Sequence, residues 1–199
     1  MKKILASLVI IAMAVVSLFQ ATSAVFEESV RVAGTSFTVG TSAEDNTAGN
    51  TALKFLLNVS GSTESSNLTD TVAGPVLDNI DSIWSDVILL KLYNKGTTPL
   101  NVVSKAEYIN DPNTLRDDIF VKAVAWNDAN NNGVLDSGEE GVSYGYDTIL
   151  RWRNDTFPVG LLGSGEVKGV ALKFDGTGVT DSNIGQSAVY DFVFTGVEE

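Results

Sequence analysis

Residues 87–103, VILLKLYNKGTTPLNVV, carry the pattern that decides the fold. The first seven of these residues form a short apolar run, which is typical of a β-strand buried on both faces. Residues 94–99 follow with the Asn, Gly and Pro of a turn, and a second apolar segment begins at Leu100. The stretch therefore predicts two strands joined by a short connection.

Similar segments recur at residues 53–59, 119–126, 148–153, 166–174 and 187–194. Residues 53–59 alternate as a half-buried strand should, and Gly, Asn, Asp and Ser clusters separate the segments. This punctuation predicts an all-β sandwich with at most one or two short helices. One such helix is expected after Pro75, because the following apolar residues have helical spacing. These residues are Val76, Leu77, Ile80, Ile83 and Trp84.

The composition of the 199 residues excludes several classes of function. The chain has no Cys and no His, which removes disulfide frameworks, thiol catalysis and imidazole-dependent triads or zinc sites. We therefore expect no enzymatic activity. Asp and Glu number 25 against 13 Lys and Arg, and the net charge of -12 argues against nucleic-acid binding. The length favours a single domain.

Residues 1–24 have the three parts of a secretory signal peptide, whose apolar middle would be helical. Two lysines precede an uncharged run from Ile4 to Phe19, and small residues follow it. A retained membrane anchor is the alternative, but the run is shorter than the roughly 20 apolar residues that span a bilayer. We therefore predict cleavage between Ala24 and Val25, an extracellular protein, and membrane contact only through the signal segment.

The first mature segment, residues 25–41, is extended and amphipathic. Val30 and Val32 share one face, and a bulge at Gly34 would return Phe37 and Val39 to the same side. Such a segment can be the first strand of its own sheet, or it can leave its domain and pair with another copy. The pattern alone favours the ordinary first strand.

Four stretches in order resemble the TasA/camelysin family of secreted fibre-forming proteins, which includes archaeal bundling pilins. They are AVFEE at 24–28, GTSFTVGT at 34–41, YNKGTTPL at 93–100 and GQSAVYDFVF at 185–194. The chain departs from the family at Gly74-Pro75, where a Pro-Gly turn is common. It also lacks the zinc-protease motif His-Glu-x-x-His, so the protease activity described for camelysin is not carried over.

The resemblance implies a jelly-roll-like β-sandwich over residues 42–199 and a donor strand over residues 25–41. Cleavage would let subunits polymerise into an extracellular fibre or pilus, on or near the cell surface. Each would donate its N-terminal strand to the next copy by β-augmentation. The partner would be the chain itself. The implied anchors of the donor strand are Phe26, Val30, Val32, Phe37 and Val39.

Residues 128–139, DANNNGVLDSGE, match the calcium-loop pattern D-x-[DN]-x-[DN]-G-x5-E at every position. Calcium takes six to eight oxygen ligands, and such a loop supplies them. Because the preceding residues alternate like a strand, we predict an EF-hand-like loop in a β context, similar to the calcium loops of adhesin B-type repeats. A solvated Asn/Gly turn is the alternative. The predicted calcium ligands are Asp128, Asn130, Asn132, Val134 (through its carbonyl), Asp136 and Glu139.

Two further expectations remain open. The alternative to a fibre subunit is a monomeric, calcium-stabilised adhesin or binding module whose first strand stays in its own sheet. Three Asn-x-Ser/Thr sequons are candidate glycosylation sites if the source glycosylates exported chains. Their acceptors are Asn58, Asn67 and Asn154.

Overall fold

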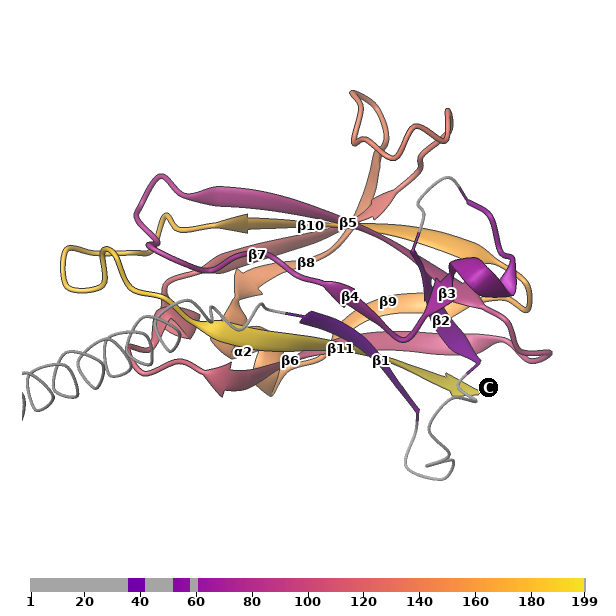
Figure 1. Cartoon of the computed structure of the whole chain (residues 1–199), viewed down its shortest axis with the longest axis horizontal. Coiled ribbons are helices and arrows are strands. Elements are labelled where there is room, and N and C mark those ends of the chain that lie inside the picture. The colour runs from indigo at the N-terminus through magenta and orange to yellow at the C-terminus, as the bar shows by residue number, and fades with distance from the viewer. Residues whose placement is uncertain (1–35, 42–51, 58–60, 199) are drawn as a thin grey trace, which may run out of the picture. The chain divides into compact units, whose positions relative to one another are not determined.

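Two β-sheets lie face to face in the computed structural model, which describes residues 36–41, 52–57 and 61–198 (Figure 1). All of them belong to one compact unit, residues 34–199. In chain order the elements are β1 (Ser36–Thr41), β2 (Leu53–Leu56), β3 (Leu68–Thr69), β4 (Thr71–Ala73), β5 (Ser85–Asn94), β6 (Leu100–Asn110), β7 (Phe120–Trp126), β8 (Glu140–Thr148), α2 (Ile149–Asn154), β9 (Phe157–Leu162), β10 (Val167–Asp175) and β11 (Val189–Glu198), with short 3-10 turns at Ser65–Asn67 and Leu115–Asp117.

The strand order confirms the predicted all-β sandwich. One sheet has the order β4-β1-β11-β6-β9, and the other has the order β3-β2-β5-β10-β7-β8. From β5 to β7 and from β9 to β11, successive strands alternate between the sheets, as expected of a jelly-roll-like arrangement. Among the described strands, β1 and β11 form the one parallel pair, and the other pairs are antiparallel.

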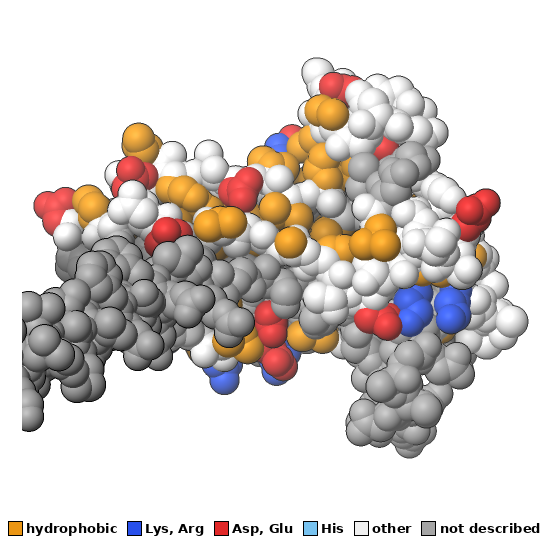
Figure 2. Space-filling model, viewed as in Figure 1, with side chains coloured by type: hydrophobic (Ala, Val, Ile, Leu, Met, Phe, Trp, Pro, Cys, Tyr) orange, Lys and Arg blue, Asp and Glu red, His pale blue; other side chains and the backbone are white. Residues whose placement is uncertain are grey.

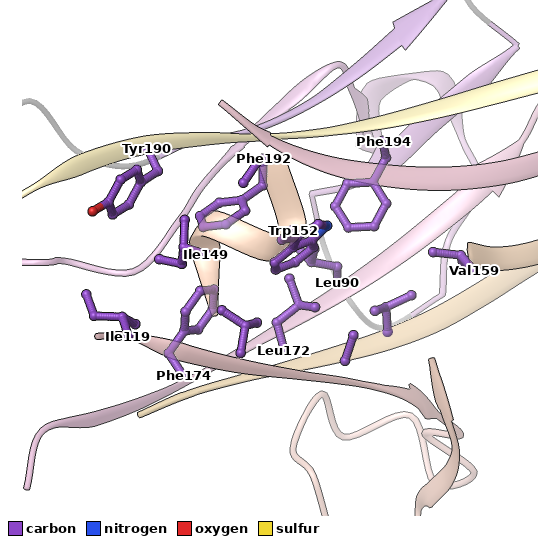
Figure 3. Close-up of a cluster of buried hydrophobic side chains, with 14 of the residues drawn as sticks. Leu90, Ile119, Ile149, Trp152, Val159, Leu172, Phe174, Tyr190, Phe192 and Phe194 are labelled. Atoms are coloured by element: carbon purple, nitrogen blue, oxygen red, sulfur yellow. The ribbon is translucent and has the colours of Figure 1, made fainter. Parts of the chain in front are cut away.

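Aromatic side chains from both sheets fill the core (Figure 3). β11 alternates, so that Tyr190, Phe192 and Phe194 are buried on its inner face. The ring of Phe192 lies 5.5 Å from that of Phe174 in β10, and the ring of Phe194 lies 5.7 Å from that of Phe55 in β2. These edge-to-face contacts join the two sheets.

Residues 149–153, predicted as part of a strand, instead form the helix α2. Thr148 accepts a hydrogen bond on its side chain from the Arg151 backbone N–H, which caps the helix. Ile149 and Trp152, three positions apart, are both buried, and the Trp152 indole N–H donates to Ser104 Oγ at 3.0 Å. The strand prediction was wrong because six residues are too few to separate the two periodicities.

The predicted helix after Pro75 is also wrong, because the residues from 76 to 84 form no helix. Leu77 and Ile80 are buried, whereas Ile83 is 87% exposed. The backbone pairs with a distant segment instead: Ile80 N–H donates to Gln186 O, and Ala188 N–H donates to Leu77 O. Tertiary hydrogen bonds have therefore replaced the local ones that a helix would make.

Asn94 ends β5 and ties two connections together. Its side chain is fully buried, and its amide N–H groups donate to the carbonyl oxygens of Thr98 and Leu162. Its Oδ1 accepts from the Gly96 backbone N–H at 2.8 Å. The predicted β5–β6 turn is therefore fastened to the end of β9 by one side chain.

The predicted signal segment, the Ala24–Val25 junction and the anchors Phe26, Val30 and Val32 lie outside the described residues. In the part of the chain that the structure describes, no helix is long and apolar enough to span a bilayer.

Candidate calcium loop and N-terminal strand

The predicted calcium loop connects β7 to β8 and projects from the sandwich at the top of Figure 1. Its two ends meet, because the backbone N–H of Asn127 donates to Glu139 O at 3.0 Å. Asp128 and Glu139, the first and last residues of the motif, are each only 8% exposed. The β-hairpin therefore brings the ends of the motif together without the flanking helices of an EF-hand.

Asp128 organises the first half of the loop through its two carboxylate oxygens. Oδ1 accepts from the Asn132 backbone N–H at 3.0 Å, and Oδ2 accepts from the Gly133 N–H at 3.2 Å. Gly133 has a φ of 72°, a left-handed conformation that glycine adopts without strain. The loop therefore turns sharply at this glycine.

Asp136 and Glu139 organise the second half. Asp136 Oδ2 accepts from the side-chain amides of Asn130 and Asn132, at 2.9 and 2.8 Å. Glu139 Oε2 accepts from the Asp136 backbone N–H and from the Trp126 indole N–H. Five of the six predicted ligands therefore share one network of side-chain hydrogen bonds. The sixth, Val134, joins through its backbone N–H, which donates to Asn132 Oδ1 at 2.8 Å.

The donor set fits calcium in its chemistry, because it consists of carboxylate, amide and backbone oxygens. Its present arrangement is closed on internal hydrogen bonds. Within the described ranges, no three acidic side chains stand close enough together to hold a metal ion. Asn130 and Asn132 turn their amide nitrogens toward Asp136, so a half-rotation of each amide would be needed to present oxygen to an ion.

A lysine from outside the motif lies against this loop. Lys91, in β5, places its Nζ 2.8 Å from Asp128 Oδ2. Both residues are buried, at 6% and 8% exposed. Burial works to raise the pKa of Asp128, but the Lys91 ammonium and the backbone N–H groups of Gly133 and Asn132 outweigh it and hold that pKa below its usual value.

The loop covers a small apolar cluster on the outer face of its sheet. Val124 and Trp126 of β7 pack with Ala171 of β10, and Leu89 and Leu135 pack against them. Leu135, the apolar residue inside the motif, therefore anchors the loop to this second cluster and not to the main core. Burial of Leu135 against this cluster therefore holds the loop to the sheet at one point.

β1 contains the described part of the predicted donor strand. It lies between β11 and β4 in its own sheet, with Phe37 opposite Phe192 and Val39 opposite Phe194 in the parallel register. Against β4, Phe37 is opposite Val72. Six residues pair with β11, whereas only three pair with β4.

The three sequons differ in their surroundings. Asn154, at the end of α2, is exposed, whereas Asn67 is half-buried and its amide donates to Ser62 O. Asn58 lies outside the described residues. Figure 2 shows acidic side chains dispersed over one face, and the Lys and Arg coloured on that face form no continuous stripe.

Comparison with known proteins leaves the family open. No family model matches the chain, and no curated protein matches it. Among solved structures, the chain is similar to the ASH/PapD-like domain of human CEP192 (PapD-like domain 7), with 13% identity and a TM-score of 0.21. That match covers 62% of this chain and 78% of the other.

Proposed function

We propose that this chain is a secreted structural subunit of an extracellular fibre or pilus. Each subunit would donate its N-terminal strand, residues 25–41, to a neighbouring copy. The polymer would be a homopolymer, and calcium in the loop 128–139 would stabilise each subunit. The proposal includes no enzymatic activity and no nucleic-acid partner.

The position of β1 is the observation that carries this proposal. β1 is inserted between β11 and β4, and the contacts that hold it in the sheet include backbone pairing with both neighbours. Backbone hydrogen bonds do not depend on which copy supplies the strand, so the same strand of a second molecule can take this place. Exchange of an identical element between copies costs little, because the strand makes the same interactions in the neighbouring sheet as in its own.

The place that β1 occupies in the sheet lies beside two apolar positions of β11. Phe192 and Phe194, opposite the two apolar positions of β1, are fully buried between the sheets. Without β1, this part of β11 would lose a neighbouring strand and expose backbone donors and acceptors. A β11 edge left without β1 would therefore favour pairing with the same strand of another copy.

The calcium part of the proposal is supported by the motif spacing and by the joined ends of the loop. Asp128, Asp136 and Glu139 lie in one 12-residue loop, and a divalent cation could bind their oxygens once the internal hydrogen bonds of the loop rearrange. An ion held there would fix the loop over the apolar cluster beneath it. Its role would be structural.

A monomeric, calcium-stabilised adhesin or binding module is the second candidate. The observation that favours it is the same strand, because β1 already pairs with β11 and β4 within one chain. In that case residues 36–41 would stay where they are, and no polymer would form.

Deletion of residues 25–33 from the mature protein tests strand donation. Filaments visible by electron microscopy for the full-length mature protein should disappear after the deletion, because half of the donor segment is lost. A substitution such as Glu107→Ala at an exposed position of β6 should leave filaments intact. Filaments that persist after the deletion would refute strand donation.

A disulfide lock gives a sharper test, because the chain contains no cysteine. Thr38 and Val193 are partners in the β1–β11 register, so Thr38→Cys with Val193→Cys would fix β1 in its own sheet. We expect oxidised protein to stay monomeric in size-exclusion chromatography and to polymerise after reduction.

The matched control joins two strands that both stay in their own subunit during exchange. Lys105 and Val193 are partners in the β6–β11 register, so Lys105→Cys with Val193→Cys should permit polymerisation in both redox states. If the oxidised Thr38→Cys, Val193→Cys protein still polymerises, the donated segment must be one other than residues 36–41.

A further inference from the structure

We propose that Lys91 is a built-in cation of the loop 128–139, which closes the loop without metal and weakens its affinity for calcium. This inference rests on the proposal that the loop binds calcium, and it adds a residue that sets the affinity. Lys91 is 37 residues from Asp128 in sequence and belongs to a different strand.

The position of Lys91 is fixed by its surroundings. Gly169 of β10 lies between Lys91 of β5 and Trp126 of β7 in the sheet register. Because glycine has no side chain, the lysine reaches across it, and its Nζ lies 5.2 Å from the centre of the Trp126 ring. A cation over an indole face is stabilised there. The ammonium is therefore held against Asp128 from two sides.

In the metal-free loop, this ammonium neutralises one of three carboxylates. Asp128 is paired with Lys91. The carboxylates of Asp136 and Glu139 accept hydrogen bonds from N–H groups within the hairpin. Each carboxylate thus has a charged or polar partner before any ion binds. The loop can close over its apolar cluster in the absence of calcium.

A calcium ion bound at Asp128 would lie close to this charge. Oδ2 of Asp128 accepts from Lys91 and Gly133, so Oδ1, which accepts from the Asn132 N–H, is the oxygen better placed to meet a metal. Since Nζ is 2.8 Å from Oδ2 of the same carboxylate and a calcium–oxygen distance is about 2.4 Å, the ion would lie within roughly 7 Å of Nζ. Even at the dielectric constant of water, repulsion between a single and a double charge about 7 Å apart weakens binding roughly sevenfold.

Lys91 therefore acts in opposite directions on the two states. It stabilises the metal-free loop by pairing with Asp128, and it destabilises the calcium-bound loop by repulsion. Extracellular calcium modules bind with Kd of about 10⁻⁴ to 10⁻³ M, and this loop is expected at the weak end of that range.

The test is calcium titration of the secreted protein, stripped with EDTA and dialysed, by isothermal calorimetry. Lys91→Gln removes the charge while keeping an N–H donor at the end of the side chain. We expect its calcium Kd to be at least about sevenfold lower than that of the unmodified protein, and its melting temperature in EDTA to be lower. Lys91→Met is a second variant if the first does not fold.

Lys122→Gln is the matched control, because Lys122 pairs with Glu140 and not with a loop ligand. The Kd of this variant should change by less than about threefold, since the Lys122 side chain is partly exposed to solvent and pairs outside the loop. Calcium binding by Lys91→Gln alone, with none by the unmodified protein, would support the inference most strongly.

Two different results would overturn the inference. If the unmodified protein binds calcium and Lys91→Gln binds it no more tightly, Lys91 does not oppose the ion, and the calcium site stands. If neither protein nor the Met variant binds calcium at tens of millimolar, the calcium site itself fails, and the inference fails with it.

Discussion

Lys91 and Trp126 lie on either side of Gly169 in the sheet, and the Lys91 Nζ is 5.2 Å from the centre of the Trp126 ring. The two side chains meet because the residue between them has none. Trp126 in turn donates its indole N–H to Glu139 at 3.2 Å, and Lys91 pairs with Asp128. Both ends of the loop are thus attached to the sheet at this glycine.

Gly169→Ala is therefore expected to destabilise the protein. A Cβ at this position would meet the Trp126 carbonyl oxygen at 2.2 Å, and backbone cannot move aside as a flexible side chain can. We expect a loss of about 2 kcal/mol in the free energy of unfolding, measured by urea denaturation. Gly163→Ala is the control, since its nearest neighbour is the end of the Glu166 side chain, at 3.1 Å. Equal effects of the two substitutions would contradict this account.

Calcium is expected to raise the melting temperature. With a Kd of about 1 mM, calcium at about 10 mM contributes about 1.4 kcal/mol, which corresponds to about 4 °C for a protein of this size. Glu139→Ala should abolish the calcium-dependent rise, because Glu139 is the predicted bidentate ligand. Glu107→Ala, at an exposed position of β6, should retain it. The same melting curve with calcium and with chelator would rule out the site.

Asn94→Ala is expected to cause one of the largest losses of stability from a single polar substitution. It removes two hydrogen bonds to the carbonyls of Thr98 and Leu162 and one from the Gly96 N–H, and it leaves a cavity. We expect a loss of about 3 kcal/mol in chemical denaturation. Asn101→Ala, at an exposed position of β6, should change stability by less than about 0.5 kcal/mol. A small effect at Asn94 would show that the two connections are held by other contacts.

Tyr190→Phe is expected to be neutral or slightly stabilising at neutral pH. The Tyr190 hydroxyl is buried without a hydrogen bond of good geometry to any described residue, and the nearby Asp111 already accepts from Arg116 and from the Leu115 N–H. Removing a buried hydroxyl that makes no well-formed hydrogen bond should leave stability unchanged or raise it by up to about 1 kcal/mol. A clear loss of stability would reveal a partner for the hydroxyl.

The same substitution has an expected pH signature. Burial, together with the negative charge of Asp111, raises the pKa of Tyr190 above its usual value. A raised folded-state pKa gives a contribution to stability that is complete below the unfolded pKa of about 10 and is lost as pH rises beyond it. The stability of the Phe variant should therefore decline less between about pH 9 and 11. Parallel declines for both proteins would contradict this assignment.

Local pattern is enough to predict much of the fold. It predicts strands at residues 87–93 and 100–103, and the structure has β5 and β6 there. An apolar run of strand length followed by turn residues predicts a strand, and this signal depends only on neighbouring residues. The loop 128–139 is recognisable for the same reason, since its predicted ligands occur at fixed spacing within 12 residues.

Local pattern fails where distant contacts decide the conformation. Leu77 and Ile80 have helical spacing but pair with residues 186–188, more than 100 positions away, and Ile149 and Trp152 turn into the core on a helix. The parallel pairing of β1 with β11 joins the first and last described strands, and no local signal specifies it.

By itself the sequence determined the β class, the turns and the identity of the loop residues, because periodicity and motif spacing are properties of adjacent positions. Only the tertiary structure decided which residues meet across strands. Lys91 reaches Asp128 because β5, β10 and β7 are neighbours in that order and because Gly169 lies between them without a side chain. The charge opposite the predicted calcium ligand is therefore set by strand order.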